Sequence, residues 1–160
     1  MRRGFVCLLV VLCLLTGCAD GYPEGIKIQC KDLQLTLPGD FIDLSDEGIG
    51  DGEFLYGRNT LVFTGLAEDK NGLQEMTLDE YTGYVISGNE LTCSPIVCGD
   101  GYLFSYEATI GEIPYTYTIA TGEGASNFWI LQFYCPSADL AENQPEIDII
   151  LSGLQFQKNS

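Results

Sequence analysis

The stretch GYLFSYEATIGEIPYTYTIATGEGASNFWILQFYCP, residues 101–136, decides the fold. Apolar and polar residues alternate along 102–109 and again along 115–119, as in strands with one buried face. Gly111-Glu112 and the glycines at 122 and 124 predict two chain reversals. The segment FWILQFY at 128–134 is apolar nearly throughout, which is typical of a central strand covered on both faces. We therefore predict three consecutive strands in an antiparallel meander.

Further strands are expected before the meander. Residues 26–30 and 33–37 alternate in the same way, and Lys31-Asp32 between them reads as a tight connection, so the two segments predict a hairpin. Residues 54–56 and 61–66 add two short strands.

Two helices complete the expected set. Thr77 and Glu80 have the spacing of a capping box, which predicts a helix that ends near residues 87–89. A final helix is expected to start near Gln144-Pro145, because proline is tolerated in the first turn. Helices that interrupt and end an antiparallel sheet indicate the α+β class.

The N-terminus predicts export and a lipid anchor. Residues 4–15 are almost wholly apolar behind Arg2 and Arg3, but this run is too short to span a membrane. Leu15-Thr16-Gly17-Cys18 resembles the lipobox of bacterial lipoproteins, in which the cysteine is lipidated. The alternative is an ordinary cleaved signal. We expect a signal peptide at 1–17, a lipidated Cys18 and tether at 18–25, and a single domain at 26–160 on the extracytoplasmic face of the cell membrane.

The charge balance limits the partners. The chain has 23 acidic and 7 basic residues and no histidine. Removal of residues 1–17 would leave 5 basic residues and a net charge of −18. Nucleic acid is not expected as a partner, because phosphate contacts need clustered lysine and arginine. The expected partners are the membrane, through the lipid on Cys18, and an unidentified envelope protein.

Four cysteines remain in the expected domain: Cys30, Cys93, Cys98 and Cys135. An even number in an oxidising compartment indicates two disulfides, with three possible pairings. Free buried thiols are one alternative. A zinc site is another, but the cysteines lack the close spacing of zinc ligands and the chain has no histidine. No metal and no cofactor are expected.

The sequence carries no recognisable catalytic motif. Without histidine the common catalytic triads and dyads are excluded, and there is no nucleophile elbow or phosphate-binding loop. Carboxylates are plentiful, but no spacing singles out a pair. We expect no catalytic residues and no enzymatic activity.

The acidic stretch from Asp43 to Glu53 resembles a calcium loop in part. Counted from Asp43, positions three, five, six and nine fit an EF-hand, but position twelve is Phe54. The acid that completes the calcium coordination is therefore missing. An exposed loop is the favoured interpretation, and weak cation binding stays open.

The meander contains five tyrosines and one tryptophan, which fit either a ligand groove or the core. Large rings bury much area and favour strands, so the core is the favoured interpretation. The six residues are Tyr102, Tyr106, Tyr115, Tyr117, Trp129 and Tyr134.

The order of these segments resembles a known fold. LQLTLPGDF at 33–41, TLDEYTGYVISGN at 77–89, the meander and PEIDIILSGLQF at 145–156 are similar to the PsbP/Mog-like family, which includes small bacterial lipoproteins. The resemblance implies an antiparallel sheet packed between helices, and proteins that bind or stabilise other proteins. It transfers no functional residue to this chain.

These observations predict a membrane-anchored, non-catalytic protein-interaction or assembly module. One alternative is a small accessory lipoprotein that binds a solute or a cation, which would need a deep polar pocket beside the meander. The other is an envelope hydrolase, which would need carboxylates that converge in a cleft.

Overall fold

A computed structural model describes residues 24–48, 52–73 and 76–158. The expected signal peptide, Cys18 and most of the tether lie outside these residues and stay predictions. Within them, no helix is long and apolar enough to cross a membrane.

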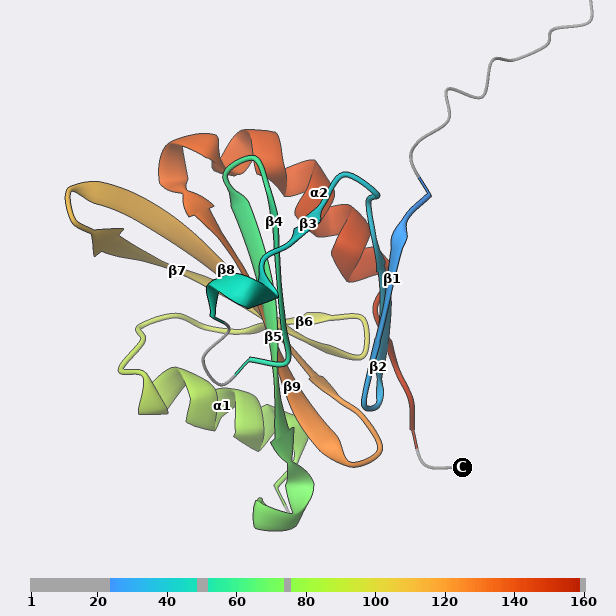
Figure 1. Ribbon diagram of the computed structural model, residues 1–160. Helices are drawn as coiled ribbons and strands as arrows, with labels where there is room; N and C mark the ends of the chain where they lie inside the picture. Colours follow the sequence, from blue (N-terminus) through green and yellow to red (C-terminus); the bar gives the residue numbers. More distant parts are fainter. Residues whose placement is uncertain (1–23, 49–51, 74–75, 159–160) are drawn as a thin grey trace, which may run out of the picture.

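Two antiparallel sheets and two α-helices form the fold (Figure 1). The larger sheet has the order β3-β4-β5-β9-β8-β7-β6 and the smaller the order β1-β2-β10. The α+β class predicted from the sequence is confirmed. The elements of the larger sheet are β3 (Ile42–Asp43), β4 (Phe54–Arg58), β5 (Leu61–Asp69), β6 (Ile96–Cys98), β7 (Gly101–Ile110), β8 (Ile113–Glu123) and β9 (Asn127–Pro136). The others are β1 (Ile26–Cys30), β2 (Leu33–Leu37), β10 (Gln155–Phe156), α1 (Leu78–Gly88), α2 (Leu140–Ser152), and the short 3-10 turns η1 (Ser45–Glu47), η2 (Lys70–Gly72) and η3 (Ser137–Asp139).

The predicted meander is confirmed as β7, β8 and β9. Tyr106 pairs with Tyr117, and Tyr117 pairs in turn with Tyr134. The turn between β7 and β8 has Gly111 at φ 65°, the first central position of a two-residue turn, where glycine is favoured. The second reversal comes slightly later than predicted, because β8 continues to Glu123.

The capping box at the start of α1 is confirmed. The Thr77 hydroxyl accepts a hydrogen bond from the Glu80 N–H at 3.3 Å, and the Glu80 carboxylate accepts from the Thr77 N–H at 2.8 Å. The predicted start of the last helix was wrong, since α2 already begins at Leu140 and holds Pro145 inside it. Pro145 is exposed, so the hydrogen bond that it cannot make is lost on the solvent side of the helix.

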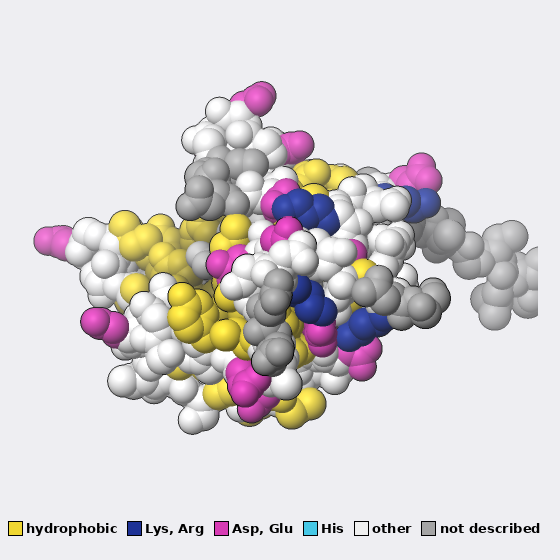
Figure 2. Space-filling view, turned by 90° about the horizontal axis from the view of Figure 1, so that it is seen from below, with side chains coloured by type: hydrophobic (Ala, Val, Ile, Leu, Met, Phe, Trp, Pro, Cys, Tyr) yellow, Lys and Arg dark blue, Asp and Glu magenta, His cyan; other side chains and the backbone are white. Residues whose placement is uncertain are grey.

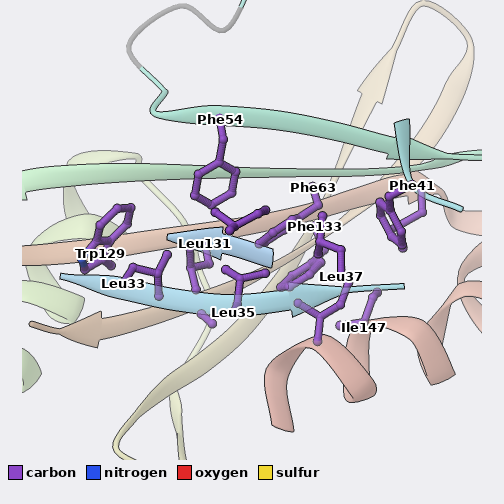
Figure 3. Close-up of a cluster of buried hydrophobic side chains, with 14 of the residues drawn as sticks. Leu33, Leu35, Leu37, Phe41, Phe54, Phe63, Trp129, Leu131, Phe133 and Ile147 are labelled. Carbon is purple, nitrogen blue, oxygen red and sulfur yellow. The ribbon is translucent and has the colours of Figure 1, made fainter. Parts of the chain in front are cut away.

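The main core lies between the larger sheet on one side and α2 with the smaller sheet on the other. Trp129 is fully buried there, as predicted for the core. Figure 3 shows Leu33, Leu35 and Leu37 of β2 among Phe63 of β5, Trp129, Leu131 and Phe133 of β9, and Ile147 of α2. A second cluster lies on the opposite face under α1, where Tyr81 stacks on Phe128 with ring centroids 4.5 Å apart.

Asp32, in the turn between β1 and β2, joins the two sheets. Its side chain is buried, with 7% exposed, and accepts hydrogen bonds from the N–H groups of Ser126 (2.7 Å) and Asn127 (3.0 Å). It also accepts from the Asn127 amide (3.1 Å) and from the Trp129 indole N–H (2.7 Å). A Cβ at Gly124 would lie 2.3 Å from the Asp32 carboxyl carbon, so glycine is required at this approach. The sequence identified Asp32 only as part of a turn.

The pKa of Asp32 reflects two opposing effects. Burial favours the neutral acid and would raise the pKa. The donors from Ser126, Trp129 and Asn127 stabilise the carboxylate and outweigh the burial, so the pKa lies below its usual value.

All four cysteines are free thiols, so the structure contains none of the predicted disulfides. Cys93 packs against the cluster under α1, whereas Cys135 is buried in the main core on the other face of the same sheet. The sheet therefore separates these two thiols. Cys30 packs against the main core and Cys98 is exposed. Burial raises the pKa of both Cys30 and Cys135, which keeps these thiols protonated.

We predict that Asp32→Ala lowers the free energy of unfolding by about 2–4 kcal/mol, because four donors lose their acceptor. Urea denaturation measures this change. Asp46→Ala is the matched control, since Asp46 is exposed in η1, and it should change stability by less than about 0.5 kcal/mol. Equal effects of the two variants would contradict the role of Asp32.

The same contact predicts a pH dependence. Because the folded-state pKa of Asp32 is lowered, its contribution is complete above the usual carboxyl pKa near 4 and is lost as the pH falls below it. The stability gap between wild type and Asp32→Asn should therefore narrow between about pH 5 and pH 2. A gap that is constant over this range would argue against a charged Asp32 in the fold.

We also predict that iodoacetamide labels Cys98 in the native protein without reductant, and labels Cys135 only after unfolding. Cys98 is exposed, whereas Cys135 is 1% exposed and its pKa is raised. Mass spectrometry of the digested protein identifies each labelled site, and Cys98→Ser should remove the fast reaction. Four unlabelled cysteines that react only after reduction would restore the disulfide prediction.

Candidate functional site

The face of the larger sheet that carries α1 is only partly covered. Near the start of α1, Thr82 lies 2.7 Å from Thr121 of β8, hydroxyl to hydroxyl, and Tyr81 covers Phe128. Further along the same strands, the side chains of Tyr106, Tyr117 and Tyr134 are only partly buried. The outer part of this face is therefore open to solvent.

Three tyrosines form a stack across the open part of the face. Tyr106 and Tyr117 have ring centroids 4.9 Å apart at an interplanar angle of 3°, and Tyr117 and Tyr134 are 5.4 Å apart at 23°. Their positions follow from the strand register, which places one of these tyrosines on each of β7, β8 and β9. Cross-strand aromatic pairs of this kind stabilise a sheet. We call these three residues the tyrosine ladder.

The apolar surface continues beyond the ladder to the tip of the β7–β8 hairpin. Alternation brings Tyr115 and then Ile110 and Ile113 to the same face, and the two isoleucines are 53% and 52% exposed. We call the whole surface the tyrosine face. It consists of Tyr106, Tyr115, Tyr117, Tyr134, Ile110 and Ile113, and none of these residues is charged.

The tyrosine face stays uncharged at physiological pH. The pKa values of Tyr106 and Tyr134 are raised above the usual tyrosine value, mainly because the two side chains are partly buried. Their hydroxyls therefore remain protonated and can donate hydrogen bonds. A surface of this kind, apolar with a few polar tips, is typical of protein interfaces.

Basic residues lie elsewhere on the surface. Figure 2 shows a band of hydrophobic side chains on the left of the face viewed, with lysine and arginine confined to the other side. Three of the five described basic residues are held in ion pairs: Lys31 with Glu53, Arg58 with Asp40 and Glu146, and Lys70 with Glu123.

A small cavity adjoins the ladder. It has a volume of about 230 Å³ and lies between the C-terminal half of α1 and the sheet. Val85 and Asn89 line it from α1, and Phe104, Tyr106 and Gln132 line it from the sheet. Tyr106 thus belongs to both the cavity and the tyrosine face.

A larger cavity, of about 540 Å³, lies on the opposite side of the meander, between the β6–β7 turn and α2. Leu103, Leu154 and Phe156 give it an apolar wall, and Asp100 and Asp148 line its edge. Both aspartates are exposed, and Asp148 accepts a hydrogen bond from Gln144 at 2.8 Å. The burial that tunes a carboxyl group for acid or base catalysis is missing here.

The structure describes the acidic loop only in part, because residues 49–51 lie outside the described ranges. Asp43 accepts a hydrogen bond from the Ser45 N–H at 2.9 Å, and Asp46 and Glu47 are exposed in η1. Among the described residues, no three acidic or cysteine side chains form a group that could hold a metal ion. An exposed loop stays the favoured interpretation, with weak cation binding as its alternative.

The tyrosines and the tryptophan of the meander therefore differ in their roles. Trp129 belongs to the core, as predicted. Tyr106 and Tyr117 pack against the cluster under α1, but all three ladder tyrosines are only partly buried and also form part of the surface. Alternation placed the tyrosines correctly on one face of the sheet. It carried no information on how far α1 covers that face.

Several solved structures share this architecture. Cyanobacterial PsbP (CyanoP) from Synechocystis sp. PCC 6803 matches with a TM-score of 0.55 at 8% identity, over 89% of this chain and 98% of that chain. The Ran-binding protein Mog1p of Saccharomyces cerevisiae matches with a TM-score of 0.55 at 9% identity, over 85% and 97%. LpqN, which is involved in cell envelope biogenesis of Mycobacterium tuberculosis, matches with a TM-score of 0.53 at 9% identity, over 86% and 93%.

A structure from Bacteroides thetaiotaomicron VPI-5482 matches with a TM-score of 0.62 at 14% identity over 87% of this chain, which spans only 50% of that one. No protein-family model and no curated protein matches the chain. At identities of 8 to 14% these likenesses show the fold alone. The chain has the fold of PsbP and Mog1p, as the resemblance in its sequence implied.

Proposed function

We propose that this chain is a lipoprotein anchored through Cys18 on the extracytoplasmic face of a membrane, and that its domain is a non-catalytic module that binds an envelope protein through the tyrosine face. The observation that carries the proposal is the uncharged, partly exposed tyrosine ladder on a chain with 23 acidic residues. The solvated face of an antiparallel sheet usually carries polar and charged residues, whereas exposed apolar patches mark interaction sites.

Tyrosine suits this role for two physical reasons. Its ring supplies a large contact area with few rotatable bonds, so little conformational entropy is lost on binding. The stack holds the rings in place before a partner arrives, because Tyr117 lies between two neighbours. Tyrosine is also enriched among the residues that dominate binding energy at interfaces.

The position of the tyrosine face fits a tethered protein. In Figure 1 the described chain enters β1 on the right, whereas the β7–β8 hairpin projects to the left. A tether that ends at β1 would leave the tyrosine face turned away from its own attachment point and accessible to other proteins.

The comparisons support an interaction role without specifying a partner. One protein of this fold is a Ran-binding protein and another is involved in cell envelope biogenesis. A small solute-binding lipoprotein is the second candidate, because the cavity of about 540 Å³ beside the meander is large enough for a small molecule.

Affinity capture tests the proposal. The tagged, full-length protein is cross-linked in its own membrane and the captured proteins are identified by mass spectrometry. Tyr117→Ser should reduce the main captured protein at least about tenfold, because it removes the centre of the ladder. Tyr84→Ser is the matched control, since Tyr84 is 57% exposed on α1, and it should leave capture unchanged.

Circular dichroism must show that both variants fold. Capture that is equal for wild type and Tyr117→Ser would contradict the tyrosine face as the site. Recovery of a small molecule without any protein would favour the solute-binding candidate.

The anchor gives a separate prediction. Cys18→Ala should move the protein from the membrane fraction to the soluble fraction, because stable anchoring needs the acyl chains. Cys98→Ala is the control, since this exposed cysteine has no part in the lipobox, and it should leave the membrane fraction unchanged. A Cys18→Ala protein that still sediments with membranes would refute the lipid anchor.

A further inference from the structure

Strand β7 extends well beyond its neighbour β6. β6 pairs only with Gly101–Leu103, whereas β8 pairs with β7 from Tyr102 to Ile110. Within the part of the chain that the structure describes, residues 104–110 of β7 therefore have a paired strand on one side only. The segment that connects α1 to β6 places Cys93 near Tyr106. The β7 edge is therefore least covered from Glu107 to Ile110, where every residue is exposed.

The other edges of the two sheets are protected in ways that this segment is not. β3, β6 and β10 are two or three residues long, and β1 carries Lys27. Short edge strands, lysines, prolines and bulges all discourage an added strand. Residues 104–110 contain no lysine or proline, and their register with β8 has no bulge.

The turn geometry sets which backbone groups of β7 face outward. Ile110 and Ile113 close a two-residue turn, so they form a hydrogen-bonded pair with each other. Alternation then directs the N–H and C=O groups of Ser105, Glu107 and Thr109 away from β8. Among the described residues, these backbone groups are not paired with another strand.

The side chains along this edge divide by chemistry. Tyr106 and Ile110 belong to the tyrosine face, and Ala108 lies between them on the same side. Glu107 lies on the opposite side, and Glu112 is exposed in the adjacent turn. A strand added here would place one row of side chains beside Tyr106 and the other row beside Glu107.

We propose that the β7 edge binds an extended segment of a partner protein as an added strand. The segment alternates apolar or aromatic side chains, which extend the tyrosine ladder by one ring, with lysine or arginine, which face Glu107. This proposal rests on the proposed function and specifies the chemistry of its partner. Strand addition obtains affinity from main-chain hydrogen bonds and specificity from the alternating side chains.

Charge complementarity favours this occupant over a second copy of the chain. Two β7 edges paired around Glu107 would bring like charges together, which destabilises a strand pair. The chain as a whole carries a net charge of −16, so two copies also repel at longer range. A basic segment would be attracted both by Glu107 and by the net negative charge of the chain.

Fluorescence anisotropy with a labelled peptide KYKYKYKYK tests the proposal on the full-length protein extracted in detergent. Two control peptides have the same composition: one has its lysines and tyrosines in separate blocks, and the other is N-methylated at alternate residues on its pairing edge. The alternating peptide should bind at least about tenfold more tightly than either control. Equal binding of the N-methylated peptide would overturn the proposal, because that peptide keeps the charge but cannot pair.

Two variants of the protein test the same edge. Thr109→Pro removes an outward N–H without breaking a bond to β8, and it should weaken peptide binding at least about tenfold. Thr109→Ala is the matched control and should change binding less than about twofold. Glu107→Gln should weaken binding severalfold through the loss of one charge pair.

Two outcomes would overturn the proposal. A concentration-dependent dimer that Thr109→Pro abolishes in light scattering would give the edge to a second copy and overturn the proposal. Peptide binding that is insensitive to Thr109→Pro, together with capture that still depends on Tyr117, would refute strand addition and leave the proposed function intact.

Discussion

The fold depends on one buried carboxylate. Asp32 lies in the turn of the smaller sheet, yet its carboxylate accepts all its hydrogen bonds from residues 126–129, at the start of β9 in the larger sheet. No described lysine or arginine pairs with it, so neutral N–H donors alone stabilise its charge. Such bonds to a charged acceptor are stronger than neutral ones, and a buried donor without its acceptor is costly. The contact therefore fixes how the two sheets pack, and it explains why residue 124 is glycine and why Trp129 is oriented by its indole N–H.

Ion pairs and apolar surface lie in different parts of the molecule. Lys31, in the β1–β2 turn, pairs with Glu53 just before β4, and Arg58 at the end of β4 pairs with Asp40 and with Glu146 of α2. The tyrosine face has no charge of its own. A strongly acidic chain thus keeps a surface whose own residues include no carboxylate, and desolvating a carboxylate costs much more than burying a phenol.

The sequence predicted the regular parts of this molecule well because their signals are local. Alternation predicted the meander and its pairing, and the Thr77–Glu80 spacing predicted the start of α1. The start of α2 was wrong, because Pro145 was read as a first-turn residue when it lies on an exposed side further along the helix. The role of Asp32 could not be predicted, since its partners are 94 to 97 residues away. The open tyrosine face was missed for a related reason: alternation shows which side chains share a face, and the length of α1 decides which are covered.

The large sequence separation between Asp32 and its hydrogen-bond donors also affects the order in which the parts of the domain fold. The hairpin of β1 and β2 is the first part of the described chain to be synthesised, but its carboxylate finds its donors only after residue 129. The backbone carbonyl of Asp32 accepts a further hydrogen bond from the Gln157 N–H at 2.8 Å, close to the C-terminus. Contacts this distant in sequence form late, because a long loop must close first. The β1–β2 hairpin is therefore among the last parts of the described chain to reach its final packing. A chain interrupted before β9 would leave the smaller sheet without the hydrogen-bond donors of Asp32.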